Sequence, residues 1–316
     1  MYKTPTSGCR EHAVAQGGGM AANDFLPFTK MHGCGNDYVY LDALRDEGVP
    51  STTTALVALA KAMSNRHTGV GGDGLIVLAA STKGDVRMRM FNADGSESEM
   101  CGNGIRCLAK LAHDHRHVRG GDLRVETGAG VLTVTLHKSS KICDGATVGM
   151  GRPRLIPSKV PVEHAGPGPR LALTAIVNGV HHHFLAVGMG NPHAVCFVDD
   201  PDTFSVSTVG PLIEHDTRFP HRTNVEFVAR IKDERGLPVL RQRTWERGAG
   251  ETQACGTGAC AAVVAAILAE KIPGREAIVR LNGGDLHVTW PSDTEEVVMS
   301  GPAVTVFEGK WLLTKA

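Results

Sequence analysis

Apolar and polar residues alternate along much of the chain, which is the period expected of β-strands. The alternation is clearest at residues 123–136 and 277–290, where one face of a strand would be buried and the other exposed. Two short apolar runs that end in aspartate, residues 38–42 and 194–199, are typical of strands buried on both faces. The pattern therefore predicts a strand-rich protein with few helices.

One apolar run has the length of a helix rather than a strand. It covers residues 259–269, is rich in small side chains, and is too short to cross a bilayer. Because it is apolar on nearly every face, the helix predicted at residues 258–272 must be surrounded by protein. Pro273 and Gly274 would end it.

The landmarks of the first half of the chain recur in the second half in the same order. A Gly-Asn pair precedes Cys101 by 66 positions, and a second such pair precedes Cys255 by 65. Each pair is followed by a run that ends in aspartate, and each cysteine by a helix-length segment and then by alternating sequence. Ordered landmarks at near-constant spacing are the signature of an internal duplication.

We therefore predict an α+β fold of two homologous domains, each a mixed β-sheet wrapped around a central helix. The first domain would cover residues 25–152 and the second residues 153–316, joined by the proline-rich stretch 153–169. The last strand is a candidate to return to the first domain. Residues 1–24 are glycine-rich and lack the apolar core of a secretory signal, so we expect a disordered tail there.

Charge and cysteine usage narrow the class of protein. The 316 residues hold 33 Lys+Arg against 33 Asp+Glu without a basic stripe or an acidic run, so we expect neither nucleic acid nor membrane as a partner. With no export signal, the eight cysteines are expected to be reduced thiols in the cytoplasm. No C-x-x-C occurs, and the His181-His182-His183 run has no spaced fourth ligand, so no metal site is predicted.

Two cysteines stand in nearly identical sequence frames. Phe91 lies ten positions before Cys101, Trp245 lies ten positions before Cys255, and a C-G-x-G turn follows each cysteine. One such cysteine would indicate a nucleophile. Two in matched frames indicate a pair of acid/base thiols that face one substrate, which is the chemistry of an enzyme that inverts a carbon stereocentre.

The turns after the two cysteines are suited to bind an anion. Glycines on both sides of Asn103 and Thr257 let the backbone turn sharply and expose its N–H groups, and the helix that follows adds its positive end. An α-carboxylate fits such a site. The same field is expected to lower the pKa of each thiol, so that thiolate forms near neutral pH.

Other roles for these cysteines stay open at this point. A lone cysteine is more often buried than catalytic, and a non-enzymatic redox or binding protein could use the pair as a switch. A disulfide between the two is also conceivable, as an oxidised artefact. Cys107 and Cys260 fall on other helix faces than Cys101 and Cys255, so they are predicted to fill the core.

Four motifs resemble those of diaminopimelate epimerases. They are F-T-K-M-H-G-C-G-N-D at residues 28–37, F-N-A-D-G-S-E with M-C-G-N-G at residues 91–104, M-G-N-P-H at residues 189–193, and E-R-G-A-G-E-T-Q-A-C-G-T-G at residues 246–258. The resemblance runs from about residue 28 to the end of the chain. It implies a homodimeric cytoplasmic isomerase that converts LL-diaminopimelate to the meso form without cofactor or metal, for lysine and peptidoglycan synthesis.

Carried over position by position, the resemblance implies a role for each site residue. The catalytic set is Cys101, Cys255, His193 and Glu246. The substrate-binding set is Asn36, Asn92, Gly102, Asn103, Asn191, Asn224, Glu246, Arg247, Gly256 and Thr257. In this scheme the two cysteines are the acid/base pair, and the backbone after each holds the reacting carboxylate. The asparagines and Arg247 bind the second amino-acid group of the substrate, at the end that does not react. Without the resemblance, an asparagine is more often a turn or cap residue than a ligand.

One position departs from the family, and one rival family shares the chemistry. Gly74 stands where many relatives carry glutamine, so a substrate contact there would come from backbone or water. Proline and hydroxyproline racemases share the paired cysteines and the fold. They tend to carry M-C-G-H where this chain has M-C-G-N at residues 100–103. They also have no use for a group such as Arg247 that reads a second amino-acid end.

Overall fold

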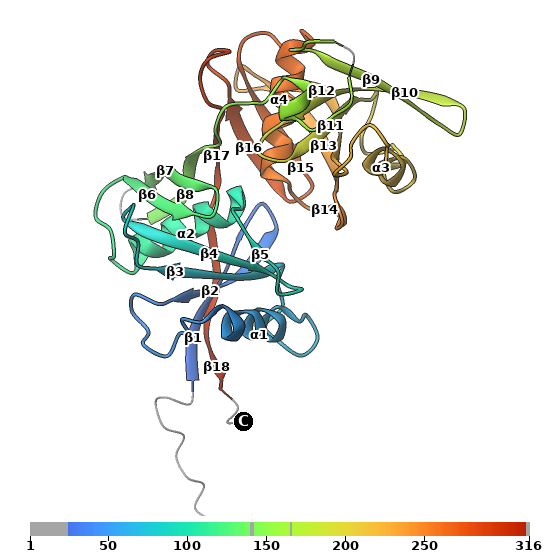
Figure 1. Ribbon diagram of the computed structural model, residues 1–316. Coiled ribbons are helices and arrows are strands. Elements are labelled where there is room, and N and C mark those ends of the chain that lie inside the picture. Colours follow the sequence, from blue (N-terminus) through green and yellow to red (C-terminus); the bar gives the residue numbers. More distant parts are fainter. Residues whose placement is uncertain (1–24, 140–141, 165, 314–316) are drawn as a thin grey trace, which may run out of the picture.

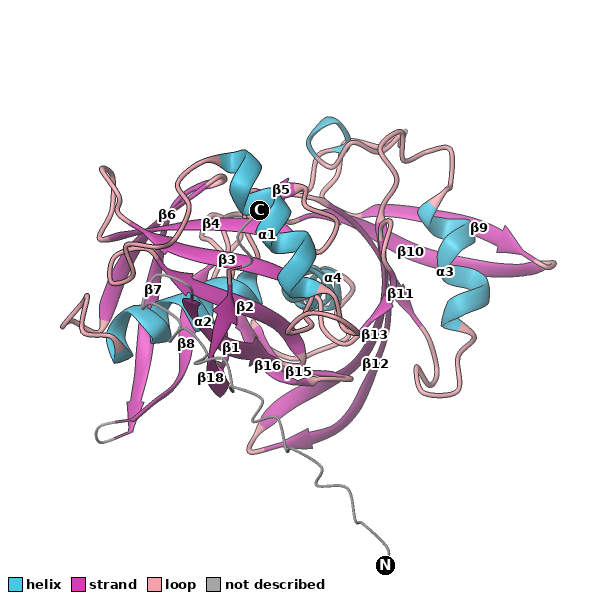
Figure 2. Cartoon of the chain, turned by 90° about the horizontal axis from the view of Figure 1, so that it is seen from below, coloured by secondary structure: helices cyan, strands magenta, loops and turns pink. Residues whose placement is uncertain are grey.

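The computed structural model describes residues 25–139, 142–164 and 166–313, and the tail predicted at residues 1–24 lies outside them. The molecule has two lobes, one built mainly from the first half of the chain and the other from the second (Figure 1). Strands dominate both lobes, and in each lobe they curve around a helix (Figure 2). The predicted α+β class is confirmed.

The first half runs from β1 to β8. Its elements are β1 (Phe25–Gly33), β2 (Asn36–Asp42), α1 (Thr53–Ser64), β3 (Gly74–Ala79), β4 (Val86–Asn92), β5 (Glu97–Ser98), α2 (Gly102–Asp114), β6 (Asp122–Thr127), β7 (Gly130–Ser139) and β8 (Ile142–Gly149).

The second half opens with a 3₁₀ turn, η2 (Pro157–Lys159), and continues to the last strand. Its elements are β9 (Leu171–Val177), β10 (Val180–Gly188), β11 (Pro192–Phe197), α3 (Val206–Glu214), β12 (Asn224–Glu234), β13 (Leu237–Glu246), β14 (Gly250–Thr252), α4 (Gly256–Leu268), β15 (Glu276–Leu281), β16 (Gly284–Thr289), β17 (Val298–Pro302) and β18 (Val304–Leu312).

The two halves repeat one pattern of strand pairing. In the first half β1 and β2 are antiparallel, β2 and β3 parallel, β3 and β4 antiparallel, and β4 and β6 parallel; β6, β7 and β8 then follow as antiparallel neighbours. The series from β10 to β17 repeats these pairings one for one, with β10 in place of β1. The internal duplication inferred from spaced landmarks is therefore present in the topology.

Two strands near the C-terminus link the halves. β17 pairs antiparallel with β8, so the two sheets meet at this seam. The chain then crosses to the first half, where β18 pairs antiparallel with β1 over the length of that strand (Figure 1). All strands of the described residues thus belong to one hydrogen-bonded network.

Strands β2 and β3 are buried on both faces, which explains their continuous apolar sequence. Tyr40 and Ile76 belong to the core cluster that contains α2, whereas Leu41 and Val77 belong to the cluster that contains α1. Successive residues of a strand point to opposite faces, so one strand can serve both clusters. Residues of α2 and α4 belong to one core cluster, so the two halves of the duplication pack against each other.

Helix α4 is enclosed by strands, as its composition predicts. Its residues from Ala259 to Ala266 are fully buried, and the small side chains let the surrounding backbone approach closely. The predicted end at residue 272 is wrong. The helix ends at Leu268, because Glu270 adopts a left-handed φ of 58° and Lys271 N donates to Ala266 O, which closes the last turn before Pro273 is reached. No helix among the described residues is long and apolar enough to cross a membrane.

Candidate active site

Both cysteines of the matched frames cap a helix. Cys101 is the N-cap of α2 and Cys255 the N-cap of α4, and both have extended backbone angles. The Sγ of Cys101 accepts a hydrogen bond from Gly104 N at 3.5 Å, and that of Cys255 accepts one from Gly258 N at 3.3 Å. Each thiol therefore lies at the point where the unpaired N–H groups of a first helical turn begin.

A cavity of about 540 Å³ opens onto both thiols. Both halves contribute to its wall, which includes Asn36, Asn92, Cys101, Gly102, Asn103, Asn191, Glu246, Arg247, Cys255, Gly256 and Thr257. Of the residues predicted from sequence, His193 and Asn224 do not line it. The size is that of a small-molecule site.

The groups within hydrogen-bond distance of Cys101 are neutral, although the Glu246 carboxylate also raises the pKa of this thiol. Its Sγ lies 3.3 Å from Asn36 Oδ1, and Asn103 Nδ2 donates to the same oxygen at 3.3 Å. The Asn36 amide is held in this orientation because its Nδ2 donates to Asp73 Oδ2 at 2.6 Å. The buried hydroxyl of Tyr38 is a further neighbour of the thiol.

Acidic groups surround Cys255. Glu246, at the end of β13, shares the cavity wall, and its Oε1 accepts a hydrogen bond from Thr252 Oγ1 at 2.6 Å. Glu226 lies on the other side. A Cβ at Gly258 would be 2.6 Å from Glu226 Oε1 and 3.2 Å from Cys255 Sγ, so these two atoms are at most 5.8 Å apart, the sum of the two distances. Only a glycine leaves room for this approach.

The expected lowering of both thiol pKa values is wrong for the substrate-free protein. Burial raises the pKa of Cys101, and the hydrogen bonds from Gly104 N and Tyr38 only partly oppose it. Burial raises the pKa of Cys255 well above its usual value, and the carboxylates of Glu246 and Glu226 add to the rise. The free energy needed to remove a thiolate from water is larger here than the stabilisation that the exposed N–H groups of the helix provide.

The two thiols are therefore chemically unequal, although their frames match. Tyr38 and His193 occupy equivalent places in the repeat, each two residues after an asparagine, so the duplicated scaffold presents a phenol to one thiol and an imidazole–carboxylate pair to the other. The thiolate is therefore more favoured at Cys101, and Cys255 is the thiol that stays protonated more readily.

Glu226 was not singled out from the sequence, yet it is central to this asymmetry. It forms a fully buried pair with His193, whose Nδ1 lies 2.8 Å from Glu226 Oε1, while His193 Nε2 lies 2.9 Å from Asn191 Oδ1. Glu226 Oε2 has no hydrogen-bond partner among the described residues. The signal available in the sequence was its place two residues after Asn224, as the one polar residue in the apolar run 225–229.

Asn224 supports the cavity wall from behind. It is buried, its Nδ2 donates to Pro192 O at 3.1 Å, and its Oδ1 accepts a hydrogen bond from Arg247 N at 2.9 Å. Its amide therefore positions the backbone of Arg247. The Arg247 side chain is exposed, lines the cavity and donates to His221 O at 2.9 Å.

A fully buried arginine underlies the first turn of α2. Arg106 donates from Nη1 to Gly102 O at 3.1 Å, from Nη2 to Asn103 Oδ1 at 2.8 Å, and from Nε to Pro302 O at 3.2 Å. No ion pair involves it among the described residues. A buried cation without an acidic partner increases the positive potential at a helix start, which favours an anion there. Sequence reasoning missed Arg106, whose equivalent in the second half is Cys260.

Gly74 lies beneath the cavity rather than in its wall. It pairs with Asn92 across β3 and β4, and a Cβ there would lie 2.2 Å from Phe91 O and 3.0 Å from Tyr38 Cε1. A side chain at this position requires the strands to separate. The glycine is therefore a close-approach position in this chain.

Known proteins resemble this chain over most of its length. The family model described as diaminopimelate epimerase matches residues 28–156 and 185–306. The diaminopimelate epimerase of Desulfovibrio desulfuricans is 47% identical over 294 residues, which cover 91% of this chain and 99% of that protein. Those of Leptospira biflexa and Bacillus cereus are 47% and 45% identical, over 90% and 89% of this chain and 98% and 96% of their own lengths.

Solved structures share the fold at much lower identity. A PhzF-family phenazine biosynthesis protein of Bacillus anthracis, 16% identical, has a TM-score of 0.66 over 91% of this chain and 99% of its own. A hydroxyproline epimerase of Agrobacterium vitis, solved with trans-4-hydroxy-L-proline, is 15% identical with a TM-score of 0.63 over 91% of both chains. At such identity the likeness concerns the fold alone.

Proposed function

This chain belongs to the diaminopimelate epimerase family, and we propose that it inverts one α-carbon of diaminopimelate, between the LL and meso forms, in the cavity that its two halves share. It is an isomerase that acts on a small amino-acid substrate. One observation supports the location of the site above all others. Two N-cap cysteines on duplicated helices open onto the same cavity.

In this proposal Cys101 and Cys255 act on opposite faces of the substrate α-carbon. A thiolate on one side takes the α-proton as its S–H bond forms and the C–H bond breaks. The thiol on the other side gives its proton to the carbanion, which leaves the carbon inverted and the two sulfurs with exchanged protonation states. The unequal surroundings of the sulfurs favour one thiolate and one thiol at the start of a turnover, which a two-base reaction requires.

The reacting carboxylate would lie against the first turns of α2 and α4. The N–H groups of Gly102, Asn103, Gly256 and Thr257 face no intrahelical acceptor, because they belong to the first turns. Charge that develops on the carboxylate as the α-proton leaves would be stabilised by these donors and by the two helix dipoles. Arg106 would support the same charge from beneath.

The far amino-acid end of diaminopimelate would bind at the polar wall formed by Asn36, Asn92, Asn191, Glu246 and Arg247. A guanidinium can hold a carboxylate through two parallel hydrogen bonds, and a glutamate can accept from an ammonium. Arg247 and Glu246 would therefore read the carboxylate and the amine of one amino-acid group. His193 and Asn224 would position this wall from the buried side.

We further propose a cytoplasmic homodimer that serves lysine and peptidoglycan synthesis, with domains at residues 25–152 and 153–316. Support for self-association comes from β18, which pairs with β1 alone among the described strands and exposes Val306, Phe307 and Leu312. Apolar side chains on an unpaired edge strand favour association with another chain. Sedimentation at micromolar concentration should give twice the chain mass, and Phe307→Glu should return the monomer.

The reaction is tested by offering the purified protein LL-diaminopimelate and L-proline separately and following optical rotation. Conversion of the first substrate alone supports the proposal. Conversion of L-proline would instead support a racemase, and inertness toward both would leave the non-enzymatic cysteine switch.

The roles of the two thiols are tested in deuterated water. Cys101→Ala and Cys255→Ala should each lower epimerisation by about 10²–10⁴-fold, the usual contribution of one acid/base group. Each variant keeps one thiol and most of the carboxylate site, so each should still exchange the α-proton of one stereoisomer for deuterium. Opposite isomer preferences would assign each cysteine to a face. Near wild-type epimerisation by either variant would contradict the two-base mechanism.

A further inference from the structure

A cluster of three potential metal ligands lies at the opposite end of α2 from the catalytic thiol. Asp42 ends β2, His115 caps the C-terminus of α2, and His117 follows two residues later. The helix separates this cluster from Cys101 by about 20 Å, at 1.5 Å per residue. None of the three residues lines the cavity between the thiols. The cluster is therefore a feature that epimerisation does not use.

The two imidazoles converge on one carboxylate oxygen. His115 Nδ1 lies 2.7 Å and His117 Nε2 lies 2.6 Å from Asp42 Oδ2, and the three potential ligand atoms are all within 4.8 Å of one another. The other oxygen, Asp42 Oδ1, accepts a hydrogen bond from Leu44 N at 3.0 Å, which fixes the plane of the carboxylate. The Asp42 side chain is only 3% exposed and the histidines 13% and 19%, so little solvent competes for these atoms.

The backbone holds both histidines in place. Arg116, between them, has a left-handed φ of 65°, and His117 N donates to Ala112 O at 2.9 Å. This is the hydrogen-bonded turn that ends a helix when one residue adopts the left-handed conformation. It reverses the chain after one residue, so side chains two positions apart reach the same carboxylate. The donor set is therefore held by the last residue of β2 and by the hydrogen-bonded turn that ends α2.

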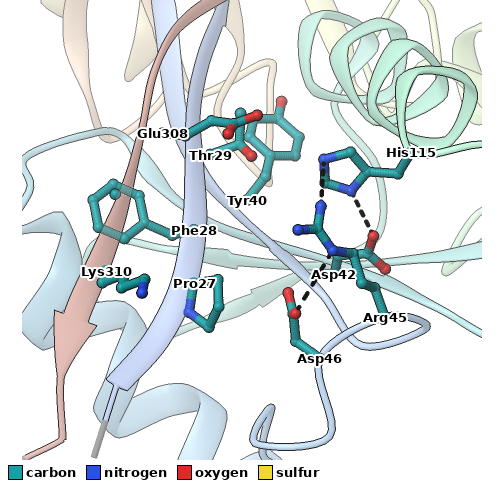
Figure 3. Close-up of a pocket in the computed structure, with 11 residues that line it drawn as sticks. Pro27, Phe28, Thr29, Tyr40, Asp42, Arg45, Asp46, His115, Glu308 and Lys310 are labelled. Atoms are coloured by element: carbon teal, nitrogen blue, oxygen red, sulfur yellow. Dashed lines mark hydrogen bonds and ion pairs between the residues drawn. The ribbon is translucent and has the colours of Figure 1, made fainter. Parts of the chain in front are cut away.

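A second cavity, of about 390 Å³, gives access to the cluster (Figure 3). Asp42 and His115 form part of its wall together with Tyr40, Arg45 and Asp46. An ion could enter by this route, and a water molecule in the cavity could complete its coordination. Arg45 Nη1 lies 3.4 Å from His115 Nε2, but the Arg45 side chain is 58% exposed and free to turn away.

We propose that Asp42, His115 and His117 form a Zn²⁺ site that ties the C-terminal end of α2 to β2. Two imidazole nitrogens and one carboxylate oxygen are ligands that Zn²⁺ accepts, whereas Ca²⁺ and Mg²⁺ prefer oxygen alone. Tetrahedral Zn²⁺ with bonds of 2.0–2.2 Å separates its ligand atoms by about 3.4 Å, so the three side chains need to part by less than 1 Å. The ion takes the place of the hydrogens that the two imidazoles direct at Asp42, and each neutral ring then carries its hydrogen on its other nitrogen. The role is structural, distant from the proton transfers of the reaction.

The contact between Arg45 and His115 distinguishes a Zn²⁺ site from a cluster that is held by hydrogen bonds alone. If Nδ1 of His115 binds the ion, the neutral ring carries its hydrogen on Nε2, and Nε2 cannot then accept from Arg45. Removing Arg45 also removes a cation near the ion. Arg45→Ala should therefore tighten Zn²⁺ binding about tenfold.

Zn²⁺ binding should be measured by calorimetry on the full chain without an affinity tag. The catalytic thiols are replaced by serine at positions 101 and 255, because they would bind the same ion. We expect one Zn²⁺ per chain, and Co²⁺ at the same site should show visible absorbance without the near-ultraviolet thiolate bands. His117→Gln should weaken binding about 100-fold or more. His113→Gln, on the same helix but outside the cluster, is the matched control and should leave it unchanged.

A melting experiment gives an independent readout. At 100 times its Kd, Zn²⁺ should raise the melting temperature of a chain of this size by about 4 °C, and it should have no effect on His117→Gln. Circular dichroism verifies that the variants fold. If His117→Gln is unfolded, the effect of Arg45→Ala decides the question. Absence of a 1:1 complex below about 1 mM Zn²⁺ would overturn the proposal. So would binding that His181→Ala and His183→Ala remove while His117→Gln does not.

Discussion

The carboxylate of Glu226 should control the charge of the Cys255 thiol, and Glu226→Gln tests this directly. The substitution keeps the size of the side chain and an oxygen that accepts from His193, but it removes the negative charge. Because Glu226 Oε1 lies at most 5.8 Å from Cys255 Sγ, the repulsion between carboxylate and thiolate is about 3 kcal/mol at an effective dielectric constant of 20. Removing it should lower the pKa of Cys255 and increase its thiolate population about 100-fold at neutral pH.

The assay is alkylation by iodoacetamide at pH 7.5, with each cysteine peptide quantified by mass spectrometry. A thiolate of lower pKa is also a weaker nucleophile, with a Brønsted coefficient of about 0.4–0.5. The hundredfold gain in thiolate should therefore appear as about a tenfold faster reaction at Cys255. Cys101 in the same molecule is the internal reference, because its surroundings include Asn36 and Tyr38 in place of Glu226.

Two controls separate the electrostatic effect from a loosened fold. Glu251→Gln removes a surface carboxylate that pairs with Arg243 and should change neither thiol. The melting temperature of Glu226→Gln should not fall, because one oxygen of this buried carboxylate has no hydrogen-bond partner among the described residues. An unchanged rate at Cys255, or an equal increase at both thiols, would refute the reasoning.

Three further predictions follow from the same structure. Arg106→Met should lower kcat/KM by about tenfold, because it removes a buried positive charge beneath the first turn of α2, whereas Lys110→Met, farther along α2 where Lys110 pairs with Asp114, should not. Hydrogen bonds from Arg218 lower the pKa of Asp216, so their contribution to stability is complete above the unfolded value near 3.9 and is lost as pH falls through the lower folded pKa. Asp216→Asn should accordingly reduce the free energy of unfolding by about 2 kcal/mol at pH 7 and by progressively less as pH falls through the folded pKa, as measured by urea titration. Dialysis against EDTA should leave the epimerisation rate of the folded protein unchanged, because in the proposed mechanism two thiols and two helix termini supply the chemistry; a loss of activity that a metal ion restores, with the fold intact throughout, would contradict that mechanism.

The duplicated architecture and the place of Cys101 and Cys255 at two helix starts could be predicted without a structure, because their signals are local or repeat at a fixed spacing. A glycine on each side of Asn103 and of Thr257 marks a turn into a helix, and a turn of this kind places the preceding cysteine at the N-cap. Equal spacing of landmarks in the two halves requires equal strand pairing. The composition of residues 259–269 likewise required a helix surrounded by protein.

Other predictions failed because they depended on terms that a local pattern does not contain. The pKa of a thiol at a helix start is the balance between burial and nearby N–H groups, and the depth of burial is a property of the packed cavity. The end of α4 depended on a left-handed turn at Glu270, a conformation that glutamate seldom adopts, and not on the proline nearby.

What the sequence by itself determined was the repeated frame: two capped helices, each followed by strands in the same order, with a thiol at the start of each. Only the tertiary structure decided which side chains meet across that frame. Glu226 reaches Cys255 because β12 lies against α4 at a glycine, and Asp42 meets His117 across 75 residues because α2 ends beside β2. Such contacts depend on the packing of strands and helices that are distant in the chain, where distances of a few ångströms set the charge of a thiol or bring together the ligands of an ion.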